Sequence, residues 1–321
     1  MKKLMFGSSD HNRNMKNLYM APMEGVTGYV FRNAYVKNYG PVDKFFTPFI
    51  ANRELSNKEI RECDPGNNAG INLIPQILTN KEEDFVYIAN NLKERFGYGE
   101  VNFNLGCPSG TVVARGRGAG FLRDLDNLDR FLDYIFEHTN VRISIKTRTG
   151  IEDSASWEQI LEIYNRYPLT ELIVHPRNQV DGYKGKPNMN DFTTAYLGCR
   201  HLLTYNGDVN SVEDYNNIVT SYPNVDAVMC GRGILYNPGL FNEIKGADRV
   251  SNERLLSFIE DVYLGYKDIM SGDMNTLYKM KELWGFFCEN FDDSHKVYKK
   301  IKKCQKCSDY ENIISTLKSS L

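Results

Sequence analysis

The sequence has few cysteines and no long uninterrupted apolar run. Its seven cysteines are an odd number scattered over 321 residues, which favours reduced thiols over a disulfide framework. No window approaches the roughly 18 uninterrupted apolar residues of a membrane-spanning helix. The charged and polar stretch 1–17 also lacks the apolar segment of a signal peptide. We therefore expect a cytoplasmic protein with no membrane segment.

An excess of charge of either sign is missing as well. The formal net charge is −2, with 41% hydrophobic and 25% charged residues, which is ordinary globular composition. No global electrostatic field indicates a nucleic-acid partner, so any RNA contact has to come from a local basic patch. The length suits one large domain with a small one, or two ordinary domains.

Two cofactor-related motifs are absent. No Gly-x-Gly-x-x-Gly follows a strand-like run, so the sequence contains no recognisable dinucleotide-binding domain. Cys304 and Cys307 form a single Cys-x-x-Cys pair with no second pair at zinc spacing. We expect two ordinary helical cysteines there and no metal site.

Eight short apolar or β-rich runs recur, with helix-length segments between them. The runs are 18–23, 44–49, 72–78, 100–107, 142–148, 171–177, 202–208 and 227–233, and helical patterns include 82–96, 128–139, 157–167 and 212–222. Strands that alternate with helices predict an α/β fold with a parallel sheet. Eight repeats match a closed (β/α)₈ TIM barrel of roughly 250 residues. An open doubly wound sheet is the alternative.

After about residue 248 the strand pattern stops. The segments 252–270 and 275–291 and the Lys-rich stretch from 294 onwards have amphipathic helical patterns. We therefore predict a barrel domain over residues 1–248 and a small all-helical domain over 249–321. The run 296–306 carries six lysines, which suits either a solvated helix face or an RNA contact.

Polar residues gather at the C-terminal ends of nearly all eight runs. They are Glu24, Gln76, Cys107, Arg148, His175, Arg177, Asn206, Asp208 and Arg232. One or two such residues would be ordinary capping. Since barrel enzymes build their active sites at that face, so many polar strand ends predict a site there.

Cys107 follows a strand directly and precedes a proline, which ends the strand. Its thiol could be a nucleophile, a proton donor or a small buried hydrophobe. An ordinary thiol pKa of about 8.5 keeps it protonated at neutral pH, which suits a general acid. The glycine-rich segment 110–124 carries Arg115 and Arg117, and it could bind phosphate or RNA, or form a flexible surface loop.

Lys146 and Arg148 lie two residues apart on a strand and so face the same side, as do His175 and Arg177. Cations inside a barrel are costly unless they are paired or bind a ligand. We therefore expect an anionic partner, such as a reduced flavin, near Lys146. The alternatives are a surface pair at a frayed strand end and, for His175, a hydrogen-bonded structural residue.

Glycine-containing turns end the last two runs, in Asn206-Gly207-Asp208 and in Gly231-Arg232. Loops at these two places often form the phosphate site of a barrel, because glycines let the backbone approach a phosphate closely. An ordinary turn is the alternative for each.

Seven motifs follow one another in a recognisable order. They are MAPMEGVTG (20–28), IPQI (74–77), NLGCPS (104–109), KTRTG (146–150), HPR (175–177), YNGD (205–208) and GRGILYNP (231–238). In this order they resemble the dihydrouridine synthases, and 282–303 is similar to that family's helical RNA-binding domain. The resemblance covers residue 18 to about 305.

The resemblance implies FMN as cofactor, NADPH as reductant and reduction of specific uridines in tRNA to 5,6-dihydrouridine. Hydride would pass from flavin N5 to C6 of uracil, and Cys107 would give a proton to C5. The resemblance implies a cofactor set of Pro22, Met23, Glu24, Gln76, Lys146, His175, Asn206, Gly207, Asp208, Gly231 and Arg232. On the substrate side, Asn104 would orient the uracil, and we expect Arg115, Arg117, Arg148 and Arg177 to contact the RNA.

One departure and two alternatives remain. Family members often carry a lysine soon after the Cys-Pro pair, whereas here Ser-Gly-Thr-Val-Val follows and Arg115 comes later, which bears on substrate detail. An FMN-dependent reductase of a free pyrimidine, as dihydroorotate dehydrogenases are, would not need the Lys-rich helical region. A non-catalytic RNA-binding barrel would not need Cys107, Lys146 and His175. We expect a monomer, because a bulky RNA needs open access.

Overall fold

The computed structural model describes residues 15–291 and 293–319. The expectation that no signal peptide is present concerns residues 1–17. Of these, residues 1–14 lie outside the described residues. Within them, parallel strands form one sheet in the order β3-β2-β1-β9-β8-β7-β6-β5-β4. The strands are β1 (Asn17–Met20), β2 (Lys44–Phe46), β3 (Leu73–Ile74), β4 (Gln76–Ile77), β5 (Glu100–Leu105), β6 (Arg142–Gly150), β7 (Glu171–Asn178), β8 (Leu202–Asn206) and β9 (Ala227–Cys230).

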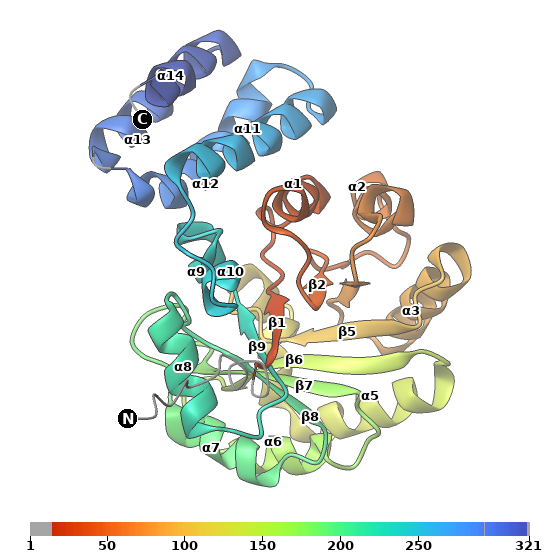
Figure 1. The fold of residues 1–321 in the computed structure, drawn as a ribbon. Coiled ribbons are helices and arrows are strands. Elements are labelled where there is room, and N and C mark those ends of the chain that lie inside the picture. Colours follow the sequence, from red (N-terminus) through yellow and green to blue (C-terminus); the bar gives the residue numbers. More distant parts are fainter. Residues whose placement is uncertain (1–14, 292, 320–321) are drawn as a thin grey trace, which may run out of the picture.

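The barrel closes at the run 72–78. Pro75 divides this run into β3, which pairs with β2, and β4, which pairs with β5. Because proline has no backbone N–H, it interrupts the ladder at this point. The two edges of the sheet thus belong to one stretch of chain, and Ile77 also bridges to Ile50. All eight predicted runs contain strands, and the predicted (β/α)₈ barrel is confirmed in place of an open sheet (Figure 1).

Helices surround this sheet. They are α1 (Tyr29–Tyr39), α2 (Asn57–Cys63), α3 (Glu82–Phe96), α4 (Gly110–Val113), α5 (Leu125–His138), α6 (Trp157–Tyr164), α7 (Met189–Gly198), α8 (Val212–Ser221), α9 (Arg232–Tyr236) and α10 (Leu240–Ile244), with short 3-10 turns η1 (Pro65–Asn68) and η2 (Gly118–Arg123). The four helical patterns predicted between the runs correspond to α3, α5, α6 and α8.

Side chains fill the barrel interior in layers. At the N-terminal end of the strands, the Lys44 ammonium lies between the carboxylates of Glu100 and Glu171, at 3.3 and 2.8 Å. Above this ionic layer lies an apolar cluster of Tyr19, Ala21, Phe46, Ile74, Ile173, Ala227 and Met229. Since alternate residues of a strand share a face, the same inward positions continue on β7 from Ile173 to His175. The polar residues at the C-terminal ends of the strands therefore lie directly above a layer of packed apolar side chains.

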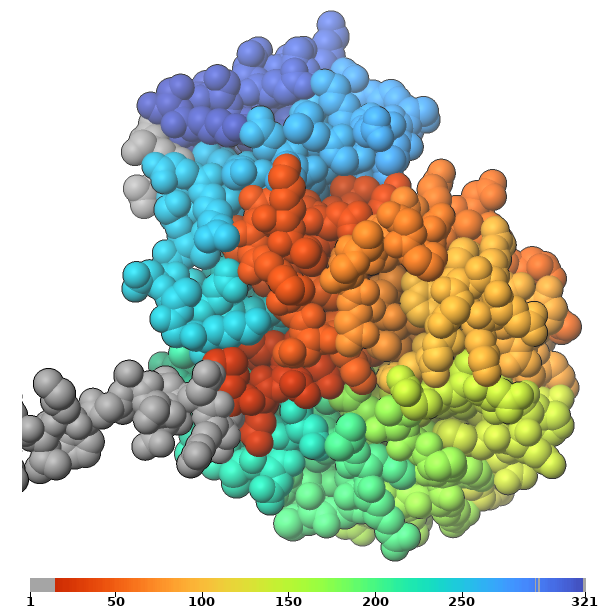
Figure 2. Space-filling view, turned by 45° about the vertical axis from the view of Figure 1, so that its right-hand side comes forward, coloured from red at the N-terminus to blue at the C-terminus, as the bar shows by residue number. Residues whose placement is uncertain are grey.

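The predicted all-helical C-terminal region is confirmed. It comprises α11 (Asn252–Ile269), α12 (Asp273–Phe287), η3 (Cys288–Asn290), α13 (Ser294–Lys303) and α14 (Cys307–Ser319). α11 packs on α1 of the barrel, where the ring of Phe258 meets Phe31 edge to face at 5.3 Å. Figures 1 and 2 show this region stacked on the N-terminal helices of the barrel. One apolar cluster runs through both parts, and the division at residue 248 into two domains stays a prediction.

Two further observations concern the described residues only. No helix among them is long and apolar enough to cross a membrane. Cys304 and Cys307 are buried in the apolar cluster, and no group of three or more His, Cys, Asp or Glu side chains in residues 15–291 and 293–319 is arranged to hold a metal ion. The expectation that no metal is bound stays a prediction.

Candidate active site

A two-lobed cavity opens at the C-terminal ends of the strands. The larger lobe has a volume of about 390 Å³ and the narrower lobe about 70 Å³. The larger one is lined by Pro22, Met23, Glu24, Val26, Phe49, Gln76, Asn104, Gly106, Cys107, Pro108, Lys146, Arg148, His175, Tyr183, Arg232, Leu235 and Phe286. The narrower one adds Ala21, Asn206, Gly207, Asp208, Asn210, Gly231 and Gly233. Every residue predicted as catalytic or cofactor-binding thus lines one cavity, whereas the role of each stays a prediction.

A ladder of buried amides leads across the cavity floor to Cys107. Gln76 donates to the side-chain oxygen of Asn102 and accepts from the amide of Asn104, both at 2.8 Å. The side-chain oxygen of Asn104 accepts from the backbone N–H groups of Gly106, at 3.1 Å, and Cys107, at 2.9 Å. The loop that carries the thiol is therefore tied to β4 and β5 through side chains, which fixes where Cys107 sits.

The glycine-rich segment packs against Cys107. Gly118 has a φ of +57°, and a Cβ there would lie 2.9 Å from the Cβ of Cys107. The backbone N–H of Ala119 donates to the carbonyl of Cys107 at 3.1 Å. Burial raises the pKa of the Cys107 thiol, and the N–H of Ser109 and the nearby cations offset this only in part. The thiol is therefore held in place and stays protonated at neutral pH.

Lys146 presents an unpaired cation to both lobes. Within the described residues its ammonium has no hydrogen bond or ion pair. Burial, followed by the charge of Arg148, lowers the pKa of Lys146 to about 7. A buried ammonium without a partner is costly, so this position suits an anionic or electron-rich ligand.

His175 is held in its neutral form. Burial lowers its pKa well below the ordinary value, and the charges of Lys146 and Arg148 add to the effect. Its Nε2 lies 3.1 Å from the guanidinium of Arg177. Because a guanidinium can only donate, Nε2 is the acceptor and Nδ1 bears the proton. His175 thus offers the cavity a neutral ring.

Asp208 is shared between two arginines. Arg177 donates to its Oδ1 at 3.0 Å and Arg232 donates to the same oxygen at 2.8 Å. Burial by itself would raise the pKa of Asp208, but the hydrogen bonds and charges of these arginines hold it below the usual range. Arg177 is 1% exposed and also donates to the carbonyl of Gly185. Its guanidinium therefore braces the loops after β7 and β8.

The arginines predicted to contact substrate occupy different surroundings. Arg148 lines the larger lobe, yet it is 1% exposed and donates to the carbonyls of Gly106, Asn178 and Gly182. Arg115 and Arg117 lie outside the cavity lining, and Arg117 donates to the side chain of Asn80 at 3.2 Å. Substrate contact by these residues stays a prediction, and the hydrogen bonds of Arg148 and Arg177 favour a positioning role.

Several lining residues were not among the predicted site residues, and Tyr183, Leu235 and Phe286 are three of them. Tyr183 is 57% exposed in the loop after β7, with the guanidinium of Arg232 4.8 Å from its ring centroid. Leu235 of α9 and Phe286 of α12 line the larger lobe. The helical region therefore contributes a wall of the cavity. A tyrosine between glycines in Gly182-Tyr183-Lys184-Gly185 was the one sequence signal that could have indicated the first of them.

The comparison with protein families is decisive for the assignment. A sequence profile described as "Dihydrouridine synthase (Dus)" matches residues 19–316. The chain belongs to the dihydrouridine synthase family. Among its relatives, a "Probable tRNA-dihydrouridine synthase" of Helicobacter pylori J99 is 28% identical over 240 residues, covering 73% of this chain and 71% of the relative. The "tRNA-dihydrouridine synthase B" of Pasteurella multocida is 26% identical, covering 71% of this chain and 68% of the relative.

Solved structures are similar to this dihydrouridine-synthase fold at the level of architecture. The old yellow enzyme homologue from Zymomonas mobilis superposes with a TM-score of 0.54 at 12% identity, covering 79% of this chain and 95% of that one. The old yellow enzyme from Trypanosoma cruzi gives 0.53 at 10% identity, with 79% and 94% covered. These likenesses agree with the TIM-barrel assignment.

Proposed function

We propose that the protein reduces specific uridines of tRNA to 5,6-dihydrouridine, with FMN bound in the cavity and NADPH as reductant. Family membership and the names of its relatives support the reaction and the RNA class. The observation that carries the proposal is that the protonated thiol of Cys107 and the unpaired cation of Lys146 line one cavity at the strand ends.

The residues of the two lobes fit FMN. Lys146 supplies the cation that an electron-rich ring would stabilise, and Arg232 lies beside the glycine turns of the narrower lobe. A Cβ at Gly233 would lie 2.1 Å from the carbonyl oxygen of Val209, so only glycine lets the turn after β9 pack this closely against the loop after β8. The flavin, when bound, supplies the hydride that adds to C6 of uracil.

Cys107 supplies the proton. Its raised pKa keeps the thiol protonated until a negative charge develops at C5 of uracil, and the proton then passes from sulfur to that carbon. Hydride and proton together saturate the C5–C6 bond, and solvent restores the proton on sulfur. We assign the orientation of the uracil to Asn104 and the positioning of the surrounding loops to Arg148 and Arg177.

The RNA must deliver an unstacked base to this cavity. The lysines of α13, at 296, 299, 300, 302 and 303, are exposed, as is Lys306 in the turn that follows, and together they provide a basic surface. We propose that this surface and the arginines at 115 and 117 hold the RNA backbone, and that the enzyme acts as a monomer.

The test is reconstitution with the purified protein. Unmodified tRNA transcript, NADPH and protein are incubated, and dihydrouridine is quantified by nucleoside mass spectrometry, with the bound flavin identified after heat release. The proposal is supported if dihydrouridine forms only when NADPH is present and if the flavin released by heating is FMN. Reduction of free pyrimidine without reduction of tRNA would favour the free-base reductase, and tRNA binding without any product would favour the non-catalytic reading.

A further inference from the structure

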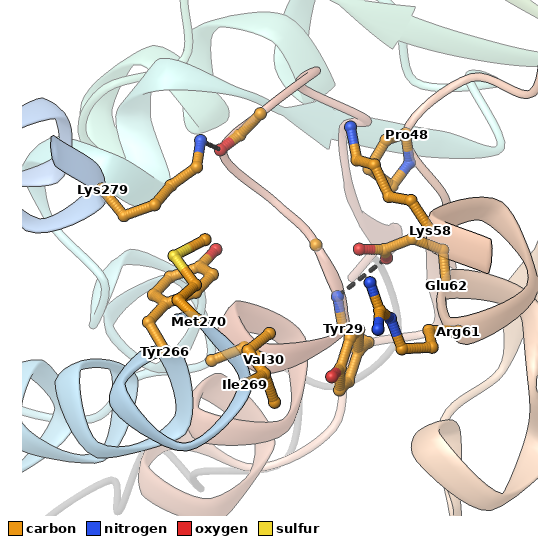
Figure 3. A pocket seen from close by; sticks show the side chains of 12 residues that line it. Tyr29, Val30, Pro48, Lys58, Arg61, Glu62, Tyr266, Ile269, Met270 and Lys279 are labelled. Carbon is orange, nitrogen blue, oxygen red and sulfur yellow. Dashed lines mark hydrogen bonds between the residues drawn. The ribbon is translucent and has the colours of Figure 1, made fainter. Parts of the chain in front are cut away.

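A second pocket lies beside the active site, between the barrel and the helical region. Its volume is about 240 Å³, and the side chains that line it include those of Tyr29, Lys58, Arg61, Glu62, Tyr266 and Lys279 (Figure 3). The walls come from the 23–28 loop and helices α1 and α2 on one side and from α11 and α12 on the other. None of the predicted site residues lines this pocket.

The 23–28 loop separates this pocket from the catalytic cavity. Glu24 and Val26 line the catalytic cavity, whereas Gly25 and Gly28 line the second pocket. Lys58 donates to Glu24 at 2.8 Å across the loop. The two cavities therefore lie on opposite sides of one short stretch of chain.

Several polar groups of the pocket have no partner among the described residues. The guanidinium of Arg61 makes no hydrogen bond or ion pair there, and the hydroxyls of Tyr29 and Tyr266 have none either. Glu62 uses Oε2 for the backbone N–H of Tyr29 and for Arg32, which leaves Oε1 open. A Cβ at Gly28 would lie 2.7 Å from this Oε1, so the glycine keeps the approach to it clear.

These groups match the parts of a nucleotide. Tyr29 offers aromatic surface for a base, and stacking on aromatic side chains is a general way to hold unpaired bases. Tyr266 also lines the pocket, but it is only 6% exposed. The free oxygen of Glu62 accepts from a base amino or imino group, while Arg61 suits a phosphate. Lys58 and Lys279 are already paired with Glu24 and Glu282. The volume lies below the roughly 300–1,000 Å³ typical of drug-sized ligands, so it suits a single base.

We propose that this pocket binds a second unpaired nucleotide of the same RNA whose uridine enters the catalytic cavity. The inference rests on the proposed RNA substrate. Extruding the target uridine from its stack disrupts the loop that carries it. A pocket on the other side of the 23–28 loop then anchors a nearby nucleotide and holds the RNA in the register that presents one particular uridine. The second pocket thereby contributes to the choice of uridine.

The test measures RNA binding and turnover separately, with the flavin-loaded enzyme and unmodified tRNA transcript. Tyr29→Ala removes the aromatic surface and Arg61→Glu reverses the free cation. Tyr134→Ala is the aromatic control, because Tyr134 lies on α5, where it stacks on His138. Arg200→Glu is the charge control, because Arg200 is exposed and precedes β8 at the N-terminal end of the barrel. Circular dichroism and flavin content establish that each variant is folded.

The expected result is a 5- to 50-fold higher Kd for tRNA in each pocket variant, on the order of one lost base contact, and less than a twofold change in the controls. Ultraviolet crosslinking of the wild-type complex, followed by peptide mass spectrometry, should give a nucleotide adduct on Tyr29. Unchanged Kd in both pocket variants, an effect of Arg61→Glu alone, or adducts confined to other surfaces would overturn the inference.

Failure of the inference and failure of the proposed function remain distinguishable. Dihydrouridine formation by the wild type with normal binding and turnover in the pocket variants would contradict the second nucleotide site and leave the proposed function standing. A wild type that forms no dihydrouridine from tRNA and shows no saturable tRNA binding would contradict both.

Discussion

The side-chain oxygen of Asn104 accepts a hydrogen bond from the backbone N–H of Cys107 at 2.9 Å. This contact links β5 to the loop that carries the thiol, and the same amide donates to Gln76 at 2.8 Å. In the proposed function Asn104 orients the uracil. The structure adds a second task, because the same residue fixes the proton donor relative to the strand. Loss of Asn104 should therefore affect chemistry as well as binding.

Asn104→Ala should lower kcat for dihydrouridine formation about 10-fold or more, because a lost hydrogen bond of about 1.4 kcal/mol in the transition state corresponds to a tenfold rate. Asn104→Asp keeps the oxygen that accepts from Cys107 and should recover part of the rate. Single-turnover kinetics with reduced enzyme isolates this step. Equal rates for the alanine variant and the wild type would show that Asn104 does not position the thiol.

Cys107→Ala should reduce dihydrouridine formation about 10²- to 10⁴-fold, the range expected for a lost general acid. Flavin content and flavin reduction by NADPH should change less than twofold, because the thiol takes no part in either. Stopped-flow absorbance measures the reductive step and mass spectrometry measures the product. Undiminished product formation would refute the acid role.

Lys146 should lower the free energy of unfolding of the flavin-free protein, and the size of this effect should depend on pH. Its folded-state pKa of about 7 lies below the roughly 10.4 of an unfolded lysine. Between these values the unfolded chain binds more protons, so stability rises with pH through that window. Below about pH 7 the cost of the buried cation is fully present. Lys146→Met should therefore raise the free energy of unfolding by about 1–3 kcal/mol at pH 6 and much less near pH 10.

Urea denaturation of flavin-free protein at both pH values measures this difference. Lys299→Met, which removes an exposed lysine of α13, is the matched control and should change the free energy of unfolding by less than about 0.5 kcal/mol at either pH. A Lys146→Met variant that is less stable at pH 6 would contradict the account. The Lys146→Met variant should also bind FMN more weakly. The lysine would then lower the stability of the flavin-free protein but strengthen cofactor binding.

Asp208→Ala should destabilise the protein more than Arg232→Ala does. It leaves Arg177, which is 1% exposed, without its carboxylate partner, and an uncompensated buried charge costs about 3–5 kcal/mol where burial is complete. Since Asp208 is itself 31% exposed, we expect about 2 kcal/mol. Arg232→Ala breaks only a partly exposed pair and should cost about 0–1 kcal/mol. Thermal unfolding of flavin-free variants compares the two, and equal losses would argue against a structural role for the Arg177–Asp208 pair.

Charge reversal on α13 should weaken tRNA binding without touching the cavity. Lys299→Glu and Lys303→Glu change exposed residues of the basic helix face. If each lysine neutralises a phosphate, the slope of log Kd against log salt concentration should fall by about 1 per residue lost. Flavin content should be unchanged. A salt dependence identical to that of the wild type would remove α13 from the RNA interface.

The sequence predicted the barrel well because its signals are local. Each strand run carries its own apolar pattern, and the two-residue spacing of His175 and Arg177 determines which face they share. Pro75 marks locally where the run 72–78 breaks, but the different partners of β3 and β4 depend on how the barrel closes. Phe286 lies far along the chain from Cys107 and reaches the cavity only because α12 packs over the barrel mouth. The second pocket likewise requires α1 and α11 to meet.

The hydrogen-bond partners of the buried arginines also could not be predicted from the sequence. Arg148 and Arg177 were correctly placed at the strand ends, yet their type alone could not tell a substrate contact from a brace. Their hydrogen bonds to backbone carbonyls and to Asp208 come from loops folded over them. Tyr183 reaches the cavity by the same folding of the loop after β7.

The most direct test of the central claim is the mapping of dihydrouridine in total tRNA by mass spectrometry, from cells with and without this protein. Without the protein, dihydrouridine should be lost at defined tRNA positions, with recovery by the wild type and none by Cys107→Ala. An unchanged dihydrouridine pattern in tRNA would contradict this claim.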